Sequence, residues 1–544
     1  MKRARYKILL ISVIMIFIIS FGKEAYSQPR LEWVSNYISD TTQFHYAIDM
    51  AIDSSGNTYV LGDESNYAIL IKINPEGSIV WKRQHQTQGQ NFVKNVFIDN
   101  SGNINMFFYS GNLYFIKYNQ NGDSILGKKL NVVFDSFTAT NLKINKNGDI
   151  FVGGSYVNIA SVKDFIILKL DKNFNIIWEY RESIPTSILN ISQIHDINFD
   201  SKGNVYYCGY DGIFSSGDTS HLYLKKINSS GIFEWRKDYA PPHTQTNGNF
   251  LLIDSNDFIY VSGSLYFIPE QGARFLILKY DINGNLIWNK YFPDSHVSGT
   301  DFTPRDAKLD KNENIIIGGD YSSTSTISND YKVFKYSNNG ELLWDKLFNI
   351  NFTAEYFKSL DIDILNNIYI TGHQSTDIDT RVHTIKTSPL GHTVWVINYI
   401  SPSFKMRGRA LGNKIIVDKY FNVYISGDGN VVDYSTEIFC LKYNQLTQIF
   451  SQIDNIRNYQ LFQNYPNPFN PETNIEIKIN ISGEYELKIF DISGKLIEIT
   501  LSKQLHSGNY IISWNADKYP SGIYFYSLYK DGEKLDMKKM ILIK

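Results

Sequence analysis

The sequence predicts an all-β protein in which an eight-bladed β-propeller precedes a small immunoglobulin-like β-sandwich. The first observation is a strand-turn-strand motif that recurs eight times between residues 28 and 445. The second is a strand-like segment at residues 31–37 with no companion strands before it, and the third is a change of rhythm after residue 445. Stacked copies of one supersecondary unit indicate a repeat architecture, and four-stranded units arranged radially are propeller blades.

The composition agrees with this fold and argues against a nucleic-acid partner. The chain has 544 residues and a formal net charge of −2, with 15% aromatic and 20% charged residues. Aromatic side chains favour strands, and the length suffices for one large domain and one small one. Because there is no basic excess, the chain lacks the positive field that attracts nucleic acid.

The first 27 residues have the three parts of a signal peptide. Four Lys and Arg residues among the first seven form a basic start, residues 8–21 are apolar, and Ala25, Tyr26 and Ser27 match the small-x-small pattern that precedes cleavage. A membrane-spanning helix needs about 20 apolar residues, so we predict a signal peptide at residues 1–27 rather than an anchor. No later segment of the sequence is apolar enough to span a membrane.

Each repeat begins with two predicted strands joined by a short turn of Asn, Asp and Gly. An Asp or Asn ends the first strand, and a small or apolar residue ends the second strand nine residues later. The turns resemble fragments of calcium loops but lack the downstream bidentate carboxylate of such loops, so we interpret them as Asx-type hairpin turns. The eight pairs are Asp53/Gly62, Asp99/Phe108, Asn145/Gly154, Asp200/Gly209, Asp254/Gly263, Asp310/Gly319, Asp363/Gly372 and Asp418/Gly427.

The second half of each repeat carries a Lys on a third strand, and nine residues later a fourth strand carries Trp in six repeats and Leu in the second. The Lys residues are Lys72, Lys117, Lys169, Lys226, Lys279, Lys335, Lys386 and Lys442. The residues that follow them are Trp81, Leu126, Trp178, Trp235, Trp288, Trp344 and Trp395, and the eighth repeat has none. A cationic lining and sugar stacking are the functional interpretations. Recurrence at one strand position favours a structural role for the Lys and Trp residues, in packing between blades.

The strand at residues 31–37 contains Trp33 and resembles the fourth strand that the eighth repeat lacks. A closed ring uses both fragments, because the N-terminal strand then completes the last blade and leaves only short sheet edges. We therefore predict eight blades. Seven blades is the alternative, since the second repeat is degenerate and has Leu126 in place of Trp.

The spacing also predicts which end of the propeller carries function. The turns between first and second strands, and between third and fourth, are tight and uniform. From the end of the second strand to the Lys, the separation varies between 9 and 17 residues. Because loops of variable length on a constant scaffold are typical of binding surfaces, we expect any site on that end, in segments such as residues 63–71 and 210–225.

No catalytic or metal-binding pattern is recognisable in the sequence. Metal-ligand His and Cys spacings, nucleophile elbows and phosphate-binding glycine loops are absent, so we expect no catalytic residue, no metal and no cofactor. Carboxylates from different blades could still meet, as in glycosidases. Cys208 and Cys440 lie in or beside strands of different repeats. We interpret them as buried free thiols, with a disulfide as the alternative in an oxidising compartment.

The repeats resemble bacterial extracellular propeller repeats of the SBBP type, whose D-x-x-G-N-x-Y-V-x-G pattern is matched from Asp53 to Gly62. Their Lys and Trp half also looks like the Trp-motif blades of quinone-dependent dehydrogenases. The adjacent-Cys pair and the calcium site expected of those enzymes are not apparent. The resemblance therefore implies the fold and a binding or scaffolding role, and it implies no activity.

A second, smaller domain follows a linker at residues 446–458. Three Pro residues in six positions form an extended lead-in, because Pro cannot occupy a central strand. Short strands with turn signals then continue to the end of the chain, which predicts a β-sandwich at residues 459–544.

This domain resembles the type A C-terminal sorting domain of the bacterial type IX secretion system. The residues that carry the resemblance are Tyr465, Pro466, Asn467, Pro468, Phe469, Asn470, Pro471, Gly494, Gly522, Lys538 and Lys539. The resemblance implies the type IX machinery as a partner and passage across the outer membrane, so that the protein is secreted or displayed on the bacterial surface. In the family the domain is commonly removed after transport.

Two function classes are compatible with the sequence. The first is a non-enzymatic propeller that binds an extracellular polysaccharide or protein, as export signals at both ends and variable loops at one end of the repeats suggest. The second is a hydrolase or lyase acting on an extracellular polymer, with carboxylates or a Tyr/His pair at the mouth of the ring. Converging acidic residues in the central depression would favour the enzyme, and a shallow mixed surface would favour binding.

Overall fold

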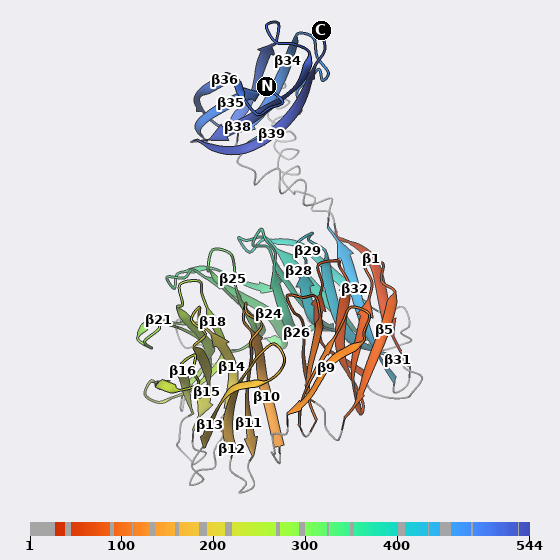
Figure 1. The fold of residues 1–544 in the computed structure, drawn as a ribbon. Helices are drawn as coiled ribbons and strands as arrows, with labels where there is room; N and C mark the ends of the chain where they lie inside the picture. The colour runs from red at the N-terminus through yellow and green to blue at the C-terminus, as the bar shows by residue number, and fades with distance from the viewer. Residues whose placement is uncertain are drawn as a thin grey trace, which may run out of the picture. The chain divides into compact units, whose positions relative to one another are not determined.

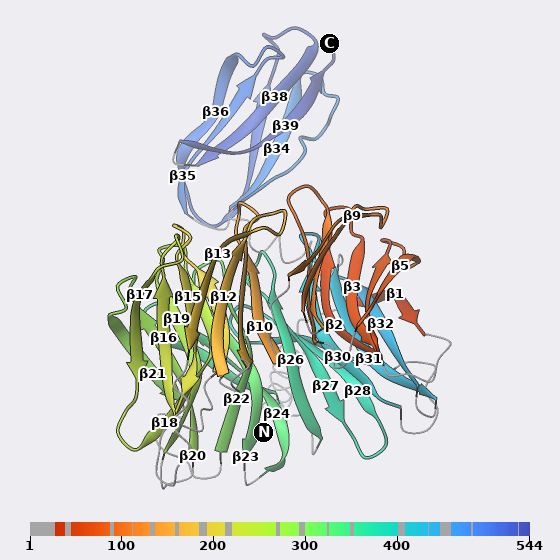
Figure 2. The same ribbon diagram turned by 60° about the horizontal axis from the view of Figure 1, so that its bottom comes forward.

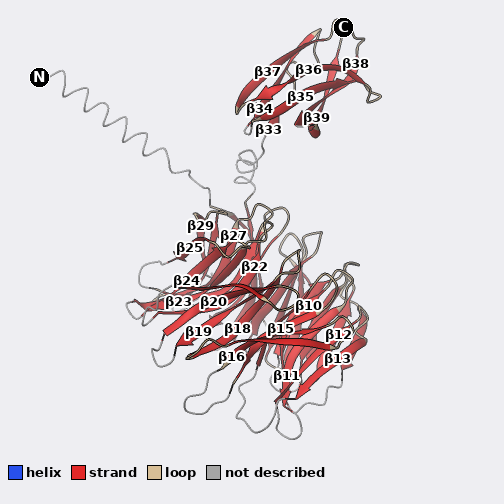
Figure 3. Cartoon of the chain, turned by 90° about the vertical axis from the view of Figure 1, so that its left-hand side faces the viewer, coloured by secondary structure: helices blue, strands red, loops and turns tan. Residues whose placement is uncertain are grey.

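A computed structural model describes residues 28–38, 45–87, 92–110, 112–130, 136–157, 163–183, 193–212, 220–267, 272–292, 300–323, 326–348, 353–400, 408–432, 435–445, 459–479, 482–530 and 532–544. Over these ranges the regular structure consists of strands (Figure 3). In the same ranges, no helix has the length and apolar character to cross a membrane. The predicted signal peptide and the predicted linker at residues 446–458 lie outside the described ranges. By its contacts the chain divides into two compact units, Met1–Gln445 and Leu446–Lys544.

The described part of the first unit contains eight antiparallel sheets of four strands each. Within each sheet the strands pair in the order of the repeat, first to fourth. The first strands are β2 (His45–Ile52), β6 (Phe92–Ile98), β10 (Ser136–Ile144), β14 (Gln193–Phe199), β18 (Thr244–Ile253), β22 (Thr300–Leu309), β26 (Ala354–Ile362) and β30 (Ala410–Val417). The second strands are β3 (Thr58–Glu64), β7 (Ile104–Tyr109), β11 (Ile150–Val157), β15 (Val205–Asp211), β19 (Ile259–Phe267), β23 (Ile315–Ser323), β27 (Ile368–Ser375) and β31 (Val423–Val432).

The third strands are β4 (Tyr67–Ile73), β8 (Leu113–Tyr118), β12 (Lys163–Leu170), β16 (His221–Ile227), β20 (Gly272–Tyr280), β24 (Thr326–Tyr336), β28 (Thr380–Thr387) and β32 (Ser435–Asn444). The fourth strands are β5 (Ile79–Gln86), β9 (Ser124–Leu130), β13 (Ile176–Ser183), β17 (Phe233–Tyr239), β21 (Leu286–Phe292), β25 (Leu342–Phe348) and β29 (Thr393–Tyr399). We call the sheets sheet 1 (β2–β5) to sheet 7 (β26–β29) in chain order. Sheet 2 (β6–β9) is complete, although its repeat lacks the Trp.

Sheet 8 takes its fourth strand from the other end of the chain. Strand β1 (Arg30–Tyr37) pairs antiparallel with β32, with Ser35 opposite Cys440. Figure 1 shows the red strand β1 beside the blue strand β32. The strand pairing expected from the sequence is therefore present, and Trp33 occupies the place of the missing fourth-strand Trp.

The eight sheets follow one another in a closed circle of contacts. Each first strand contacts the first strand of the next sheet, and β30 of sheet 8 contacts β2 of sheet 1. Figure 2 shows the first strands of several sheets on the inner side of the sheets to which they belong. The apolar core lies between neighbouring sheets: one cluster joins Val60 and Ile71 of sheet 1 to Ile438 and Cys440 of sheet 8. Cys208 and Cys440 are buried free thiols.

The uniform first turn is held by its Asp. In sheet 1 the Asp53 carboxylate accepts hydrogen bonds from the Ser55 and Asn57 amides, both at 2.9 Å, and from the Asn57 side chain and the Tyr59 hydroxyl. The Asp200, Asp254, Asp363 and Asp418 carboxylates accept equivalent bonds. A side chain that satisfies several turn donors makes the turn length invariant, which explains the constant nine-residue spacing.

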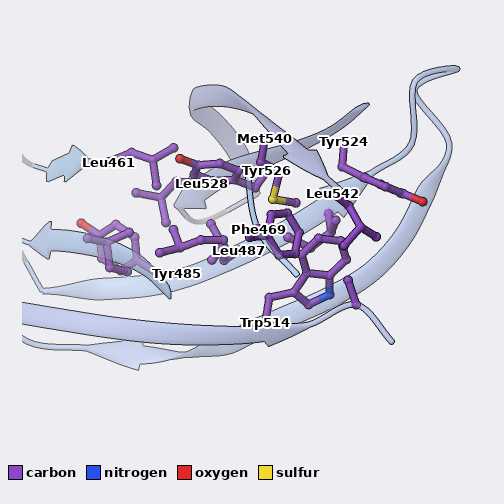
Figure 4. Close-up of a cluster of buried hydrophobic side chains, with 14 of the residues drawn as sticks. Leu461, Phe469, Tyr485, Leu487, Trp514, Tyr524, Tyr526, Leu528, Met540 and Leu542 are labelled. Carbon is purple, nitrogen blue, oxygen red and sulfur yellow. The ribbon is translucent and has the colours of Figure 1, made fainter. Parts of the chain in front are cut away.

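The second unit contains two sheets that share one core. Strands β33 (Tyr459–Leu461), β34 (Glu472–Ile479) and β37 (Gly508–Asn515) form one sheet, and β36 (Leu496–Leu505), β35 (Gly483–Phe490), β38 (Gly522–Lys530) and β39 (Glu533–Leu542) form the other. Figure 4 shows Trp514, Phe469 and Tyr524 in this core, with Leu487 and Leu528 nearby. Every second residue of β34 is buried, because one face of the strand lies against the core. This explains why apolar residues alternate with polar ones in its sequence.

Candidate functional site

The recurring Lys and Trp side chains bind the backbone of the next sheet. Lys72 Nζ and Trp81 Nε1 both donate to the Gln120 carbonyl, at 2.8 and 3.1 Å. Lys279 and Trp288 share the Asn338 carbonyl, and Lys335 and Trp344 share the Pro389 carbonyl. Each acceptor lies in the turn between the third and fourth strands of the following sheet. Because both polar groups are engaged by protein, neither is presented as a ligand for another molecule.

The Trp rings also lie against the Gly of that turn. A Cβ atom on Gly122, which has φ of +81°, would lie 2.9 Å from the Trp81 ring. The same close approach joins Gly77 to Trp33, Gly231 to Trp178, Gly284 to Trp235, Gly340 to Trp288 and Gly391 to Trp344. Trp33 donates to the Pro75 carbonyl at 2.8 Å, and Trp178 donates to the Ser229 carbonyl at 3.0 Å. Trp235 packs 5.9 Å from Tyr206, measured between ring centroids.

Sheet 8 has no third-to-fourth turn to receive the Lys and Trp of sheet 7. Instead, the Gln445 side-chain carbonyl accepts from Lys386 at 2.9 Å and from Trp395 at 3.2 Å. Burial lowers the pKa of Lys386 to about 8, although the charge of Asp363 opposes this effect. A glutamine side chain therefore takes the place of a backbone carbonyl where the chain leaves the first unit.

The Lys residues pair with the turn carboxylate in repeats that lack the buried Tyr. Asn105 and Ile316 stand where Tyr59 stands in sheet 1, and there Lys117 forms an ion pair with Asp99 at 3.2 Å and Lys335 with Asp310 at 2.8 Å. Together these contacts account for Lys72 and the Trp series as parts of the junctions between sheets, and for Asp53 as the residue that holds the turn of its own sheet.

A different set of residues lies at the centre of the circle. Every first strand has a β-bulge against its second strand, and the bulged residue lies five positions before the turn Asp or Asn. A bulge redirects one side chain. Fifteen residues after each bulged residue comes a residue of the second strand. It directly follows the small or apolar residue that ends the motif, as Asp63 follows Gly62. We call these combinations the channel pairs: Ile48/Asp63, Lys94/Tyr109, Thr140/Ser155, His195/Tyr210, Asn249/Ser264, Arg305/Asp320, Lys358/His373 and Asn413/Asp428.

Three channel pairs are in direct contact, and a fourth is coupled by charge. Arg305 Nε donates to Asp320 at 2.7 Å, and Asn413 donates to Asp428. The rings of His195 and Tyr210 lie 5.3 Å apart in an edge-to-face arrangement. Lys358 acts on His373 through its charge. In contrast to the uniform turn residues, the channel pairs differ from sheet to sheet while their backbone position is constant.

Positive charge gathers where sheets 7 and 8 meet. Lys358 on β26 and Arg409 immediately before β30 are exposed. Burial, followed by the charges of Lys358 and Arg409, lowers the pKa of His373 to about 3. Burial raises the pKa of Asp428 to about 6, although its hydrogen bond with Asn413 and the charges of Arg409 and Lys358 oppose the shift. The His373 ring is therefore neutral at physiological pH.

An aromatic ring adjoins these charges. Tyr356, two residues before Lys358, stacks on His373 with 4.9 Å between centroids and 19° between ring planes. Tyr356 is half-buried. The junction thus combines two cations, a neutral imidazole, a phenol and a buried carboxyl, which suits recognition of a polar, negatively charged molecule.

Towards the tight turns, the carboxylates of the first strands are already engaged. The Asp49, Asp196 and Asp306 carboxylates accept from backbone amides of the next sheet at 2.9 to 3.1 Å. Lys308 pairs with Asp361 at 2.6 Å, and Lys414 pairs with Asp49 at 3.6 Å across the boundary between sheets 8 and 1. Converging free carboxylates, which a glycosidase needs, are not found in the described part of this region.

A cavity of about 640 Å³ opens at the tight-turn end, between sheets 8, 1 and 2. Its walls include Ile52, Phe97, Ile98, Ile416 and Val417. Within the described ranges, no group of three or more His, Cys, Asp or Glu side chains could hold a metal ion. Its polar lining includes Asp53 and Asp418, whose carboxylates already accept the hydrogen bonds of their own turns.

The sorting-domain residues lie in the second unit. The buried Phe469 pairs with the last strand: its amide donates to the Ile541 carbonyl and its carbonyl accepts from the Ile543 amide, both at 3.0 Å. The Asn467 side chain accepts from the Ile541 amide at 2.9 Å, and Thr473 donates to the Pro466 carbonyl at 2.8 Å. Pro468, Asn470 and Pro471 complete this lead-in, Tyr465 is 81% exposed, Gly494 has φ of +82°, Gly522 begins β38, and Lys538 and Lys539 lie on β39.

The expected binding surface is only partly described. Residues 63–71 form a tight two-strand connection between β3 and β4, whereas residues 213–219 within 210–225 lie outside the described ranges. The variation in loop length did not point to the channel pairs, because the hairpins that carry them have a constant length. A usable signal exists in the sequence, since the position five residues before the turn Asp is polar in seven of the eight repeats.

Residues 463–544 match the family described as the secretion system C-terminal sorting domain. The sorting domain directs type IX secretion, so the protein is delivered to the cell surface or the extracellular space. No curated protein matches the chain significantly. The SBBP-type resemblance of the repeats in the first unit rests on their sequence pattern.

Several solved structures resemble the chain in outline. One is PorZ, a surface component of the type IX secretion system of Porphyromonas gingivalis, with 11% identity over 92% of this chain and 81% of that chain and a TM-score of 0.26. Another is the polysaccharide lyase Uly1, with 12% identity over 76% and 100% and a TM-score of 0.41. Drosophila Plexin A has 8% identity over 77% and 88% and a TM-score of 0.36. At these scores the likenesses carry no information on ligand or activity.

Proposed function

We propose that the first unit is an eight-bladed β-propeller, completed by the N-terminal strand, that binds an extracellular polysaccharide or protein without transforming it. The closed circle of contacts between first strands and the pairing of β1 with β32 support this architecture. The observation that carries the binding function is the channel pairs. Eight different residue pairs occupy one backbone position on a scaffold whose turn Asp, Lys and Trp residues are nearly constant.

The second unit then serves export. The lead-in from Tyr465 to Pro471, the turn at Gly494 and the Lys538–Lys539 strand are the residues through which the type IX machinery would recognise the chain. Because the lead-in is held by hydrogen bonds to the last strand, both ends of the domain contribute to one surface.

Binding can be tested with the chain from residue 28 to residue 544. We expect retention of the protein in affinity electrophoresis gels that contain one class of extracellular polysaccharide. Replacing Tyr356 or Lys358 by Ala should weaken retention, whereas Lys202→Ala in an exposed tight turn should not. Loss of retention only upon Lys202→Ala would place the ligand on the other end of the molecule and contradict the channel as the site.

A lyase is the second candidate, because Tyr356 and the neutral His373 lie together beside two cations. In β-elimination, a base removes the proton next to a uronate carboxylate, a C=C bond forms, and the glycosidic C–O bond breaks while an acid protonates the leaving oxygen. Neutral His373 would accept the proton, although its lowered pKa makes it a weak base. Tyr356 would act as the acid, and Lys358 or Arg409 would neutralise the carboxylate.

The two candidates differ in turnover. A lyase produces unsaturated uronates, whose ultraviolet absorbance increases with time, and His373→Ala should abolish the increase while leaving binding within about threefold. A binding protein produces no such signal from any retained polymer. Turnover that depends on His373 would therefore replace the binding proposal with the lyase.

A further inference from the structure

The channel pairs of sheets 6 and 7 have the same backbone geometry but a different charge balance. In sheet 6 the bulged Arg305 is neutralised by Asp320, at 2.7 Å. In sheet 7 the equivalent residues are Lys358 and His373, fifteen residues apart as before. Arg305 has a carboxylate partner in Asp320, whereas the residue paired with Lys358 is a histidine. Burial and nearby cations lower the pKa of His373, so its ring is neutral and does not offset the charge of Lys358.

A second cation adds to this imbalance. The backbone of Arg409 is held at the boundary of sheets 7 and 8, since the Asn430 amide donates to its carbonyl at 2.9 Å and Gly408 accepts from the Thr380 amide. No ion pair with a described residue is recorded for either Lys358 or Arg409, and both are exposed. Lys358 lies on β26, and Arg409 directly precedes β30, which contacts β26. In agreement with this, the charges of both residues act on His373 and on Asp428.

Two described carboxyl groups near these cations, Asp428 and Asp320, are committed elsewhere. Asp428 is 4% exposed, accepts from Asn413 and from the Ala47 amide of sheet 1, and holds the last sheet against the first. Asp320 performs the same structural task in sheet 6, where it accepts from the Phe357 amide at 2.7 Å. Lys358 and Arg409 are therefore two exposed positive charges that form no ion pair with a residue of the described ranges.

We propose that Lys358 and Arg409 form an anionic subsite that takes a carboxylate or sulfate group of an acidic polysaccharide. The inference rests on the proposed binding function and specifies its ligand class. Two neighbouring cations can bind a planar or tetrahedral oxyanion with charge-assisted hydrogen bonds. The partly exposed ring of Tyr356, stacked on His373, adds an aromatic group that a sugar ring can contact and that an acidic polypeptide does not require.

The test compares four polymers with the chain from residue 28 to residue 544. Polygalacturonate supplies carboxylates, dextran sulfate supplies sulfates, dextran is neutral, and poly-L-glutamate is an acidic polypeptide. The key variant is Lys358→Gln with Arg409→Gln. The matched control is Lys202→Gln with Lys311→Gln, which removes the same charge from exposed tight turns at the other end of the sheets.

We expect polygalacturonate or dextran sulfate to bind, and the Lys358/Arg409 double variant to weaken that binding at least tenfold, since a hydrogen bond to a charged group contributes about tenfold or more. The control double variant should stay within about threefold. Arg305→Gln should have a smaller effect than Lys358→Gln, because Asp320 already neutralises Arg305. Binding should weaken as salt rises. Which of the two acidic polymers binds more tightly distinguishes carboxylate from sulfate.

Three results would overturn the subsite. Equal losses in both double variants would show a general charge effect, and equal binding of poly-L-glutamate through Lys358 and Arg409 would identify an acidic protein as the ligand. Binding of dextran that both double variants retain would refute the anionic subsite while preserving the proposed function. If none of the four polymers binds and other neutral glycans and proteins also fail, the proposed function fails with it.

Discussion

Leu126 and Phe174 replace, together, the Trp and Gly that meet at six other junctions between sheets. Phe174 has φ of +63° and occupies the turn position that is Gly in sheets 1, 2 and 4 to 7. It is fully buried, and Leu126 packs against the cluster that contains it. The ring that fills this junction thus comes from the turn of sheet 3 instead of from the fourth strand of sheet 2.

The two residues should therefore be energetically coupled. Phe174→Gly removes a buried ring and should cost about 3 kcal/mol of unfolding free energy, while Leu126→Trp adds an indole where Phe174 leaves no room and should cost about 1–3 kcal/mol. The double variant recreates the pair found at Trp81 and Gly122 and should be more stable than the sum predicts, by about 1–3 kcal/mol. Urea unfolding of all four proteins measures the coupling, and additive losses would contradict it.

The Trp and Gly contact can be tested within one sheet. Gly203 and Gly231 belong to the two hairpins of sheet 4 and have φ of +80° and +85°. A Cβ on Gly231 would lie 2.9 Å from Trp178, whereas a Cβ on Gly203 would meet only Ser229 at 3.8 Å. Ala at Gly203 should cost about 1–2 kcal/mol from its backbone conformation alone. Ala at Gly231 should cost about 1–3 kcal/mol more. Thermal or urea unfolding gives both values, and equal losses would show that the ring does not constrain the turn.

Much of the fold could be predicted because its turns repeat their chemistry. The Asp53 carboxylate satisfies several donors of one turn, so insertions are disfavoured and the spacing stays constant in the sequence. The isolated strand around Trp33 was recognisable because the eighth repeat ends without one. The completeness of sheet 2 was harder to predict, since its compensating residue, Phe174, lies in the next repeat.

The candidate site could not be predicted in the same way. Variation in loop length is visible in a sequence, but variation of side chains at one bulged position is visible only when the bulge is known. Lys358 and His373 look like ordinary strand residues until the register shows Lys358 at the bulge and His373 opposite Tyr356, two residues away. Arg409 precedes its strand and belongs to no repeat position, so only the folded chain brings it beside them.

Strand β1 should protect the thiol of Cys440. This buried residue lies opposite Ser35 in β1, and Cys208 is equally buried in sheet 4. Deleting residues 31–37 removes the outer strand of sheet 8 and the Trp33 contact with Pro75, which should cost about 3 kcal/mol or more. Cys440 should then react with a thiol reagent well below the melting temperature, while Cys208 stays protected. An unchanged melting temperature and two protected thiols would show that β1 does not complete the sheet.

Asp428 should make the first unit less stable as the pH rises from about 4 to about 6. Burial raises the pKa of its carboxyl to about 6, from an ordinary value near 3.8. In this window the folded protein holds a proton that the unfolded chain has lost. Stability therefore falls as the pH rises, by about 3 kcal/mol for a shift of about two pKa units. The charges of Arg409 and Lys358 oppose this rise in the pKa of Asp428, and the value of about 6 already includes their effect.

The variant Asp428→Asn should remove this dependence and be more stable than the native protein at pH 7, because its amide can accept from Asn413 without carrying charge. Urea unfolding at pH 4, 5, 6 and 7 measures the difference between the two proteins, which should grow as the pH rises. Asp320→Asn is the comparison, and it should lower stability at pH 7 because Arg305 loses its partner. A constant difference between Asp428→Asn and the native protein across this range would show that the Asp428 carboxyl does not hold its proton in the folded state.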